Sequence, residues 1–343
     1  MVFCIFVFSK SHKVEYTIKY KAKNSYETEV TDALWQFLIA PQDNESQKLR
    51  LAEFKNSLNA ATEESTNSLN FNIYRVIQRK AFKSIDFEAN FIVRKEEVNP
   101  FSALDSIYNA EHYELINSLD FRITHEQFLN STELTGYPGA GLSFEFEENR
   151  SVFDNLQQLN NWLFTNFKFK QQVTDIRSTP EDFVARGAGV CQDFTHLFLA
   201  IARKNKIPTR YTSGYLHQGN GYKGDSQMHA WAECYIPEKG WLGFDPTNNL
   251  IALENHIKVA HGKDYSDCSP IKGVLYTSSS TNSTEYSVEV FAREENAPDV
   301  FTQSQSQGFD DRANHQQLDF QMQWQQQQQQ QQQQLRKQFS AKF

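Results

Sequence analysis

The stretch RGAGVCQDFTHLFLAIA, from Arg186 to Ala202, decides the fold of the second half of the chain. Two glycines precede a cysteine, and apolar residues recur at helical spacing after it. The pattern predicts a glycine-containing turn that leads into a helix beginning at Cys191. That cysteine has two interpretations. It is a small buried hydrophobe, as free cysteines usually are, or it is a thiol that the turn presents, since a helix N-terminus favours the thiolate.

Helical and strand patterns surround this stretch. Residues 151–167 predict one helix, and a second follows Thr179 as N-cap and Pro180 as first helical residue. The segments TRYTSGYL, HAWAECYI and GWLGFDP predict strands, and KGVLYTS and YSVEVFAR predict a strand pair that closes the same domain. Helices come before strands, which indicates an α+β fold with helices packed on an antiparallel sheet.

The first part of the chain has a different pattern. Val14, Tyr16, Ile18 and Tyr20 share one side of an alternating segment, which predicts a strand in a β-rich, sandwich-like domain. We therefore expect five regions: an unassigned leader at 1–10, the β-rich domain at 11–125, a connection at 126–150, the α+β domain at 151–295 and a tail at 296–343.

Ten consecutive glutamines at 325–334 mark the tail as low-complexity sequence. We expect it to be disordered. It is either a solvated tail or a segment that mediates self-association, because glutamine ladders favour cross-β stacking.

Composition excludes several classes of function. The 343 residues carry a net charge of -8, which disfavours a nucleic-acid-binding protein. Four cysteines without a CxxC pair disfavour a zinc ribbon, and we expect no metal or other cofactor. The apolar start is only eight residues long, too short to span a bilayer, so we expect a cytoplasmic protein that does not bind membranes.

A nucleophilic Cys191 would need a base and a group that orients the base. His229 begins an apolar strand after a glycine-containing loop, and Asp245 ends the next strand. A two-residue loop of Glu238 and Lys239 would put these side chains on opposite faces of the hairpin, whereas an odd loop or a bulge would put them on one face. Taken alone, such a histidine is usually structural, and an aspartate before proline usually forms a turn.

The segments RGAGVCQDFTHLFLAIARKNKIPTRYTSGY, MHAWAECYIPEKGW and FDPTNN together resemble the transglutaminase-like superfamily of cysteine enzymes, of the microbial two-domain type with a β-rich N-terminal region. The resemblance implies a papain-like catalytic domain at 151–295. It also implies a triad in which Cys191 is the nucleophile, His229 the general base and then acid, and Asp245 the group that orients the imidazole.

The resemblance further implies acyl transfer at an amide carbonyl of a protein or peptide, through a thioester. Hydrolysis, by a cysteine peptidase or amidase, is favoured. The alternatives are protein-glutamine gamma-glutamyltransferase activity and a non-catalytic binding or scaffold protein. The N–H of Cys191 is one candidate oxyanion donor. Papain-type enzymes place a glutamine six residues before the cysteine, where this chain has Ala185, so Gln192 is a substitute candidate. Trp231 either shields the thiol or packs in the core.

Overall fold

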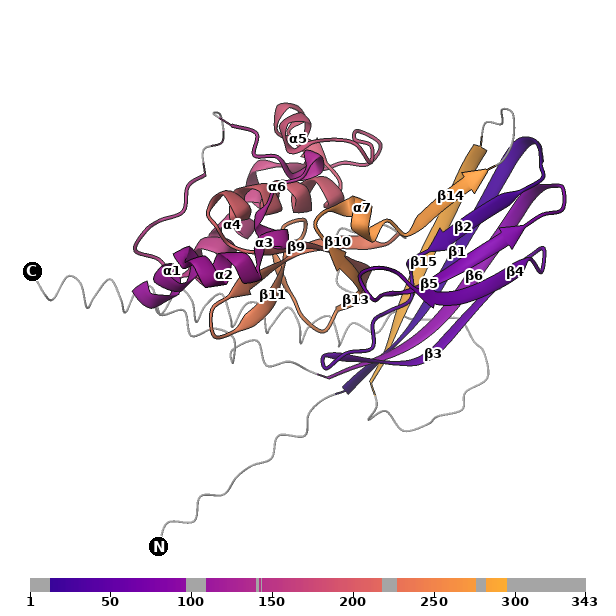
Figure 1. The fold of residues 1–343 in the computed structure, drawn as a ribbon, viewed down its shortest axis with the longest axis horizontal. Coiled ribbons are helices and arrows are strands. Elements are labelled where there is room, and N and C mark those ends of the chain that lie inside the picture. Colours follow the sequence, from indigo (N-terminus) through magenta and orange to yellow (C-terminus); the bar gives the residue numbers. More distant parts are fainter. Residues whose placement is uncertain are drawn as a thin grey trace, which may run out of the picture. The chain divides into compact units, whose positions relative to one another are not determined.

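The computed structural model of the protein describes residues 13–96, 109–139, 142, 144–217, 227–275 and 282–294. Within these ranges the chain forms three antiparallel sheets, a short parallel strand pair and several helices (Figure 1). The predicted leader at 1–10 and the glutamine-rich tail lie outside the described residues.

Two four-stranded sheets form the β-rich part of the chain. The first contains β15 (Asn282–Glu294), β1 (Lys13–Val30), β6 (Phe82–Glu96) and β3 (Gln47–Asn56), in that order. The second contains β14 (Ile271–Leu275), β2 (Ala33–Phe37), β5 (Asn72–Gln78) and β4 (Ala61–Thr66). Tyr16, Ile18 and Tyr20 of β1 are buried on one face, as the alternating pattern predicts.

Aromatic side chains fill the space between these two sheets. The rings of Trp35 and Phe37, on β2, lie 5.3 and 4.6 Å from the ring of Phe87, on β6. Phe54 of β3 contacts Phe37 with ring centroids 5.1 Å apart. Because facing aromatic pairs bury much apolar area, they hold the sheets face to face. The predicted sandwich-like region is therefore present.

Strands β14 and β15 differ from the prediction. We expected them to close the α+β domain, but β14 pairs with β2, and β15 pairs with β1 over thirteen residue pairs. Figure 1 shows both late strands among the early strands of the sandwich. An alternating pattern identifies a strand but not its partner, and here the partners are more than 200 residues away in the sequence.

The third sheet has five antiparallel strands. Their order is β12 (Leu250–Ala252), β11 (Gly240–Asp245), β10 (His229–Ile236), β9 (Thr209–Leu216) and β13 (His256–Gly262). Helix α6 (Cys191–Lys204) packs on it, with the ring of Phe198 stacked 5.7 Å from that of Phe244. The mixed α+β class with helices on an antiparallel sheet is confirmed.

The other helical segments are α1 (Ala110–Asn117), α2 (Leu119–Thr124), α3 (Glu126–Leu129), η2 (Glu133–Thr135), α4 (Val152–Asn166), α5 (Pro180–Arg186) and α7 (Tyr265–Cys268). Helices α1 and α2 lie in the range that we expected to be β-rich. Phe121 of α2 contacts Tyr235, and Phe128 of α3 contacts Trp241, so this segment packs on the β10–β11 hairpin. Among the described residues, every helix is too short or too polar to cross a lipid bilayer.

Candidate active site

Cys191 is the first residue of α6, as the sequence predicts. Helix α5 ends at Gly187, whose positive φ of 66° is the left-handed conformation that glycine tolerates best. The strand β8 (Ala188–Gly189) then pairs with β7 (Lys168–Phe169), and one residue later the helix starts. The turn thus ends at a thiol beside the free N–H groups of a helix N-terminus.

Asp193, in the first turn of α6, shapes this turn. Its Oδ2 accepts hydrogen bonds from the backbone N–H of Val190 and the hydroxyl of Thr174, both at 2.7 Å. Burial raises the pKa of Asp193, and the two donors partly offset that rise. A Cβ at Gly189 would lie 2.5 Å from Asp193 Oδ2, so glycine is needed there to make room for the capping carboxylate.

The register of the β10–β11 hairpin shows whether the side chains of His229 and Asp245 lie on the same face of the sheet. Ile236 pairs with Gly240, so the loop has three residues and not two. Glu238 and Gly240 adopt positive φ values of 64° and 78°, as bulged hairpin loops require. Because Ala232 pairs with Phe244, the next step of the register places Asp245 opposite Trp231, two residues from His229 and on the same face. The odd-loop alternative is therefore the correct one.

His229 and Asp245 are hydrogen-bonded. The distance from His229 Nε2 to Asp245 Oδ2 is 2.8 Å, and both side chains are almost fully buried. Backbone N–H groups of Thr247 and Asn248 donate to Oδ1 at 3.0 and 3.3 Å. The side-chain amide of Asn248 donates to Oδ2 at 2.9 Å. These donors fix the carboxylate. Because an ionised carboxylate only accepts, the proton of the His229 bond belongs to Nε2.

The other ring nitrogen of His229, Nδ1, is buried and forms no hydrogen bond within the described residues. The Cys191 thiol is near enough to affect this imidazole. Burial on its own would lower the pKa of His229, but the Asp245 carboxylate, together with Cys191, outweighs burial and raises that pKa to about 10. The thiol and the imidazole are thus neighbours, and Nδ1 is the ring nitrogen that remains for the thiol.

A second histidine, His256, reaches the same carboxylate and was missed from the sequence. Its Nε2 lies 3.1 Å from Asp245 Oδ2, and it is buried. Burial lowers the pKa of His256, although Asp245 opposes this. Burial alone would raise the pKa of Asp245, but the two imidazoles lower it. Nothing in the sequence marks His256 among nine histidines, because β13 reaches the site only by pairing with β9.

The His229, Asp245 and His256 ligand atoms all lie within 4.8 Å of one another. Two imidazoles and a carboxylate are a ligand set that suits zinc. However, the nitrogen–oxygen distances of 2.8 and 3.1 Å are those of hydrogen bonds to one shared oxygen. The cluster is therefore a hydrogen-bonded site.

The two remaining predicted site residues have different surroundings. The side-chain amide of Gln192 donates to the carbonyl of Ile176 at 3.4 Å, so its donor is directed to the loop before α5. Trp231 is 2% exposed, and its ring makes an edge contact with the ring of His256 at 5.1 Å. It also stacks beside His229 at 6.5 Å. The indole therefore packs against both imidazoles of the site.

The other described cysteines have no comparable surroundings. Cys234 and Cys268 are fully buried, and Cys191 is only partly buried. Burial raises the pKa of the Cys234 thiol to about 12, and it raises the pKa of Cys268 as well. Among the three described cysteines, Cys191 alone combines partial exposure with an adjacent imidazole.

A network of buried charged side chains lies on the same five-stranded sheet. Glu233 Oε2 accepts from Arg210 Nε at 2.6 Å and from Lys258 Nζ at 2.5 Å, with all three side chains at most 14% exposed. Burial on its own would raise the pKa of Glu233, but the two cations lower it to about 2. This network lies between the sheet and the sandwich, because Gln47 of β3 bonds to the backbone of Lys258.

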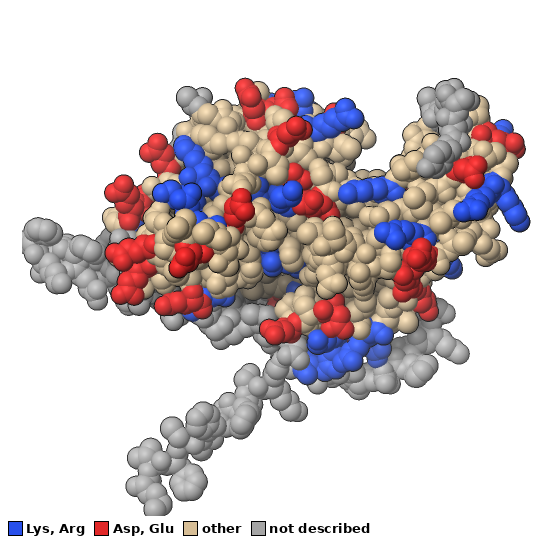
Figure 2. Space-filling view, in the orientation of Figure 1, with Lys and Arg blue, Asp and Glu red and all other residues tan. Residues whose placement is uncertain are grey.

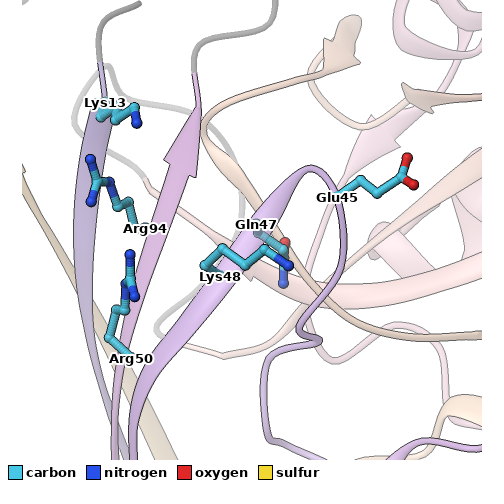
Figure 3. Close-up of a pocket in the computed structure, with 6 residues that line it drawn as sticks. All are labelled: Lys13, Glu45, Gln47, Lys48, Arg50 and Arg94. Atoms are coloured by element: carbon cyan, nitrogen blue, oxygen red, sulfur yellow. The ribbon is translucent and has the colours of Figure 1, made fainter.

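A cavity of about 120 Å³ lies on the sandwich, and none of Cys191, His229, Asp245 and His256 lines it. Its lining side chains are Lys13, Glu45, Gln47, Lys48, Arg50 and Arg94. In Figure 3, Lys13, Arg94 and Arg50 follow one another along neighbouring strands, and Glu45 points away. Over the face shown in Figure 2, acidic and basic side chains are interspersed. The candidate active site is therefore defined by the hydrogen-bonded side chains and not by the basic cavity.

Comparisons with known proteins find similar sequences and a similar fold. A family model described as the transglutaminase-like superfamily matches residues 141–246. An uncharacterized protein of Mycobacterium bovis is 32% identical over 171 residues, which cover 47% of this chain and 54% of that protein. The chain thus spans about half the length of the curated relatives it matches. A protein-glutamine gamma-glutamyltransferase of Pseudomonas aeruginosa is 30% identical over 98 residues, 27% of this chain and 14% of that protein.

A solved structure shares the fold over most of the chain. It is described as a candidate cysteine protease from Cytophaga hutchinsonii, and it aligns with a TM-score of 0.58 at 18% identity. The alignment covers 89% of this chain and 96% of that chain, so it includes the sandwich as well as the five-stranded sheet. The family match thus identifies a transglutaminase-like domain at residues 141–246, and the solved structure shows a similar fold.

Proposed function

We propose that the protein is a cysteine-dependent acyl-transfer enzyme that acts on an amide carbonyl of a protein or peptide. One observation carries the proposal: the buried His229 bonds to Asp245 through Nε2 at 2.8 Å, while Cys191 at the start of α6 is a neighbour of the same imidazole. A thiol, an imidazole and a carboxylate in that order form the nucleophile, base and orienting group of acyl-transfer chemistry.

The reaction proceeds in two steps. His229 takes the proton of the Cys191 thiol, the sulfur attacks the amide carbonyl carbon to form a C–S bond, and the C–N bond breaks as His229 gives that proton to the leaving amine. Water or a second amine then attacks the thioester and gives a proton to His229. The C–S bond breaks, and the Cys191 sulfur recovers its proton from His229. Asp245 holds the imidazole and stabilises its charged form, because the carboxylate accepts from Nε2 in both steps. The Cys191 N–H is the first oxyanion donor, by its position at the helix start.

Hydrolysis is the favoured outcome, because water is present at far higher concentration than any amine. The second candidate is transfer of a glutamine side chain to an amine, which the Pseudomonas aeruginosa relative of that name supports. A non-catalytic binding role is the third alternative, and the presence of all three triad residue types argues against it.

The test uses the full chain, an unfolded protein substrate and a fluorescent primary amine. New α-amino groups indicate a peptidase, released ammonia indicates an amidase, and label in the substrate indicates a transferase. Cys191→Ala is expected to abolish whichever activity occurs, and Cys268→Ala, which removes a buried thiol, should retain it. Equal activity of Cys191→Ala and the wild-type protein would refute the proposal.

A further inference from the structure

The segment that carries His256 is held by the sandwich. Tyr16 of β1 donates its hydroxyl to Asn255 Oδ1 at 3.3 Å, and the side-chain amide of Gln47 of β3 donates to the carbonyl of Lys258 at 2.8 Å. Between them, Lys95 of β6 contacts the backbone just before β13. Three neighbouring strands of one sheet therefore hold the start of β13, the strand at the edge of the five-stranded sheet.

Lys95 is the residue among these that bonds to both ends of the turn before His256. Its ammonium donates to the carbonyl of Leu253 at 2.6 Å and to the carbonyl of His256. The Leu253 carbonyl also accepts the N–H of His256 at 3.3 Å, so the ammonium closes the turn from which His256 emerges. Lys95 is only 6% exposed. Burying an ammonium group costs free energy, and hydrogen bonds to two backbone carbonyls offset part of that cost. The ammonium therefore fixes the position of these two carbonyls.

His256 links that turn to Asp245, because its backbone belongs to the turn and its imidazole contacts the carboxylate. The backbone of His256 is bonded to Lys95, and its imidazole donates from Nε2 to Asp245 Oδ2. The same oxygen accepts from His229. A shift of the turn would move His256 and with it one of the donors that fix the carboxylate. Misplacing a reacting group by about 1 Å costs about a hundredfold in rate.

We propose that Lys95 and His256 are positioning residues that couple the β-rich sandwich to the candidate triad: Lys95 fixes the turn at Leu253–His256, and His256 fixes the carboxylate that orients His229. This inference rests on the proposed function. It gives the sandwich a role in the reaction, since without β6 the turn would lose its ammonium.

The test is the rate at which iodoacetamide alkylates Cys191, followed by mass spectrometry as a function of pH in the full chain. Lys95→Met keeps the buried stem and removes the charge. We expect its alkylation rate at about pH 5.5 to fall about tenfold to a hundredfold and its pH profile to move toward that of a free thiol. Lys95→Arg should recover part of the loss.

Gln47→Leu is the matched control, because it removes two buried hydrogen bonds to the backbone of Lys258 at the same interface, beyond the Leu253–His256 turn, and alters no residue of the triad. Its pH profile should stay that of the wild-type protein. An unchanged profile in Lys95→Met would overturn the inference, and so would an equal change in Gln47→Leu. If the wild-type Cys191 itself shows no enhanced alkylation, the proposed function fails instead, so the two failures are distinguishable.

A second pair of variants tests the inference even if Lys95→Met does not fold. His256→Gln keeps a side-chain N–H donor for Asp245, and His256→Phe keeps only the ring shape. We expect His256→Phe to lose about tenfold in alkylation rate at acidic pH and His256→Gln to stay within about threefold of the wild-type protein. Equal rates in both variants would overturn the role of His256.

Discussion

His229 Nε2 lies 2.8 Å from Asp245 Oδ2, and both side chains are buried. This contact sets the charge of the imidazole, because in low dielectric an adjacent carboxylate stabilises the protonated ring strongly. It also sets the ring's orientation, since Nε2 is committed to Asp245 and only Nδ1 remains for the Cys191 thiol. Several measurable consequences follow from this and from the residues that support the site.

Asp245→Asn should change how stability depends on pH above neutrality. The pKa of His229 is raised to about 10, so between about pH 6.5, the unfolded value, and pH 10 the folded protein binds more protons than the unfolded chain. The wild-type free energy of unfolding should therefore fall as pH rises through this range. A neutral amide in place of the carboxylate cannot stabilise the imidazolium, so the slope should flatten in urea denaturation between about pH 6.5 and 9.5. An identical slope in both proteins would contradict the assignment.

Acid should destabilise the protein for a different reason. Burial lowers the pKa of His196 and of His261 to about 3, with Lys258 and Arg210 adding to the effect at His261. Between about pH 6.5 and 3 the unfolded chain binds more protons, so the free energy of unfolding falls as pH falls, by about 1.4 kcal/mol per pH unit for each group.

His261→Gln isolates one of these two groups. It keeps an acceptor near Arg210, which lies 3.3 Å from His261 Nε2, and removes the titration. The acid slope in urea denaturation should become shallower by about 1.4 kcal/mol per pH unit. If the slope does not change, His261 does not titrate as described.

Gly189→Ala should destabilise the turn before Cys191. The added methyl group would lie 2.5 Å from Asp193 Oδ2, which Val190 and Thr174 hold in place. We expect a loss of about 1–3 kcal/mol in the free energy of unfolding, measured with urea. At Gly136 the nearest atom would be 3.9 Å away, so Gly136→Ala should change stability by less than about 0.5 kcal/mol. Equal losses in the two variants would contradict the steric argument.

Glu233→Gln should be far more damaging than a matched change on the surface. It leaves Lys258 and Arg210 buried without a countercharge, which costs about 3–5 kcal/mol. Glu88 pairs with Lys55 at 2.8 Å, but both side chains are exposed, so Glu88→Gln should have little effect on the free energy of unfolding. Thermal or urea unfolding measures both. Comparable losses would show that the buried network contributes no more than a surface pair.

The sequence predicts the local parts of this molecule well. The turn at Gly187, the cap at Thr179 and the start of α6 at Cys191 each depend on a few adjacent residues, and the structure has them where expected. The hairpin that joins His229 to Asp245 was also foreseeable, except for its register. That register depends on the backbone conformation of Glu238 and Gly240, and a PEKG turn does not specify it.

What could not be predicted depends on contacts between distant segments. The partners of β14 and β15 lie in the first 40 residues, and His256 reaches Asp245 only because β13 joins the sheet beside β9. Lys95 reaches the same turn from more than 150 residues away. No local pattern encodes these pairings. The role of the tail and the cytoplasmic location stay predictions.

The most direct test of the central claim is competitive alkylation of the folded wild-type protein with substoichiometric iodoacetamide at about pH 5.5. Asp245 raises the pKa of His229, so the imidazole next to Cys191 is positively charged at this pH, and a neighbouring cation makes a thiol more reactive toward alkylation. We predict that Cys191 is modified first, well ahead of Cys4, Cys234 and Cys268, and that Asp245→Asn removes this preference. Modification of Cys191 no faster than the other cysteines, or an unchanged preference in Asp245→Asn, would contradict the account.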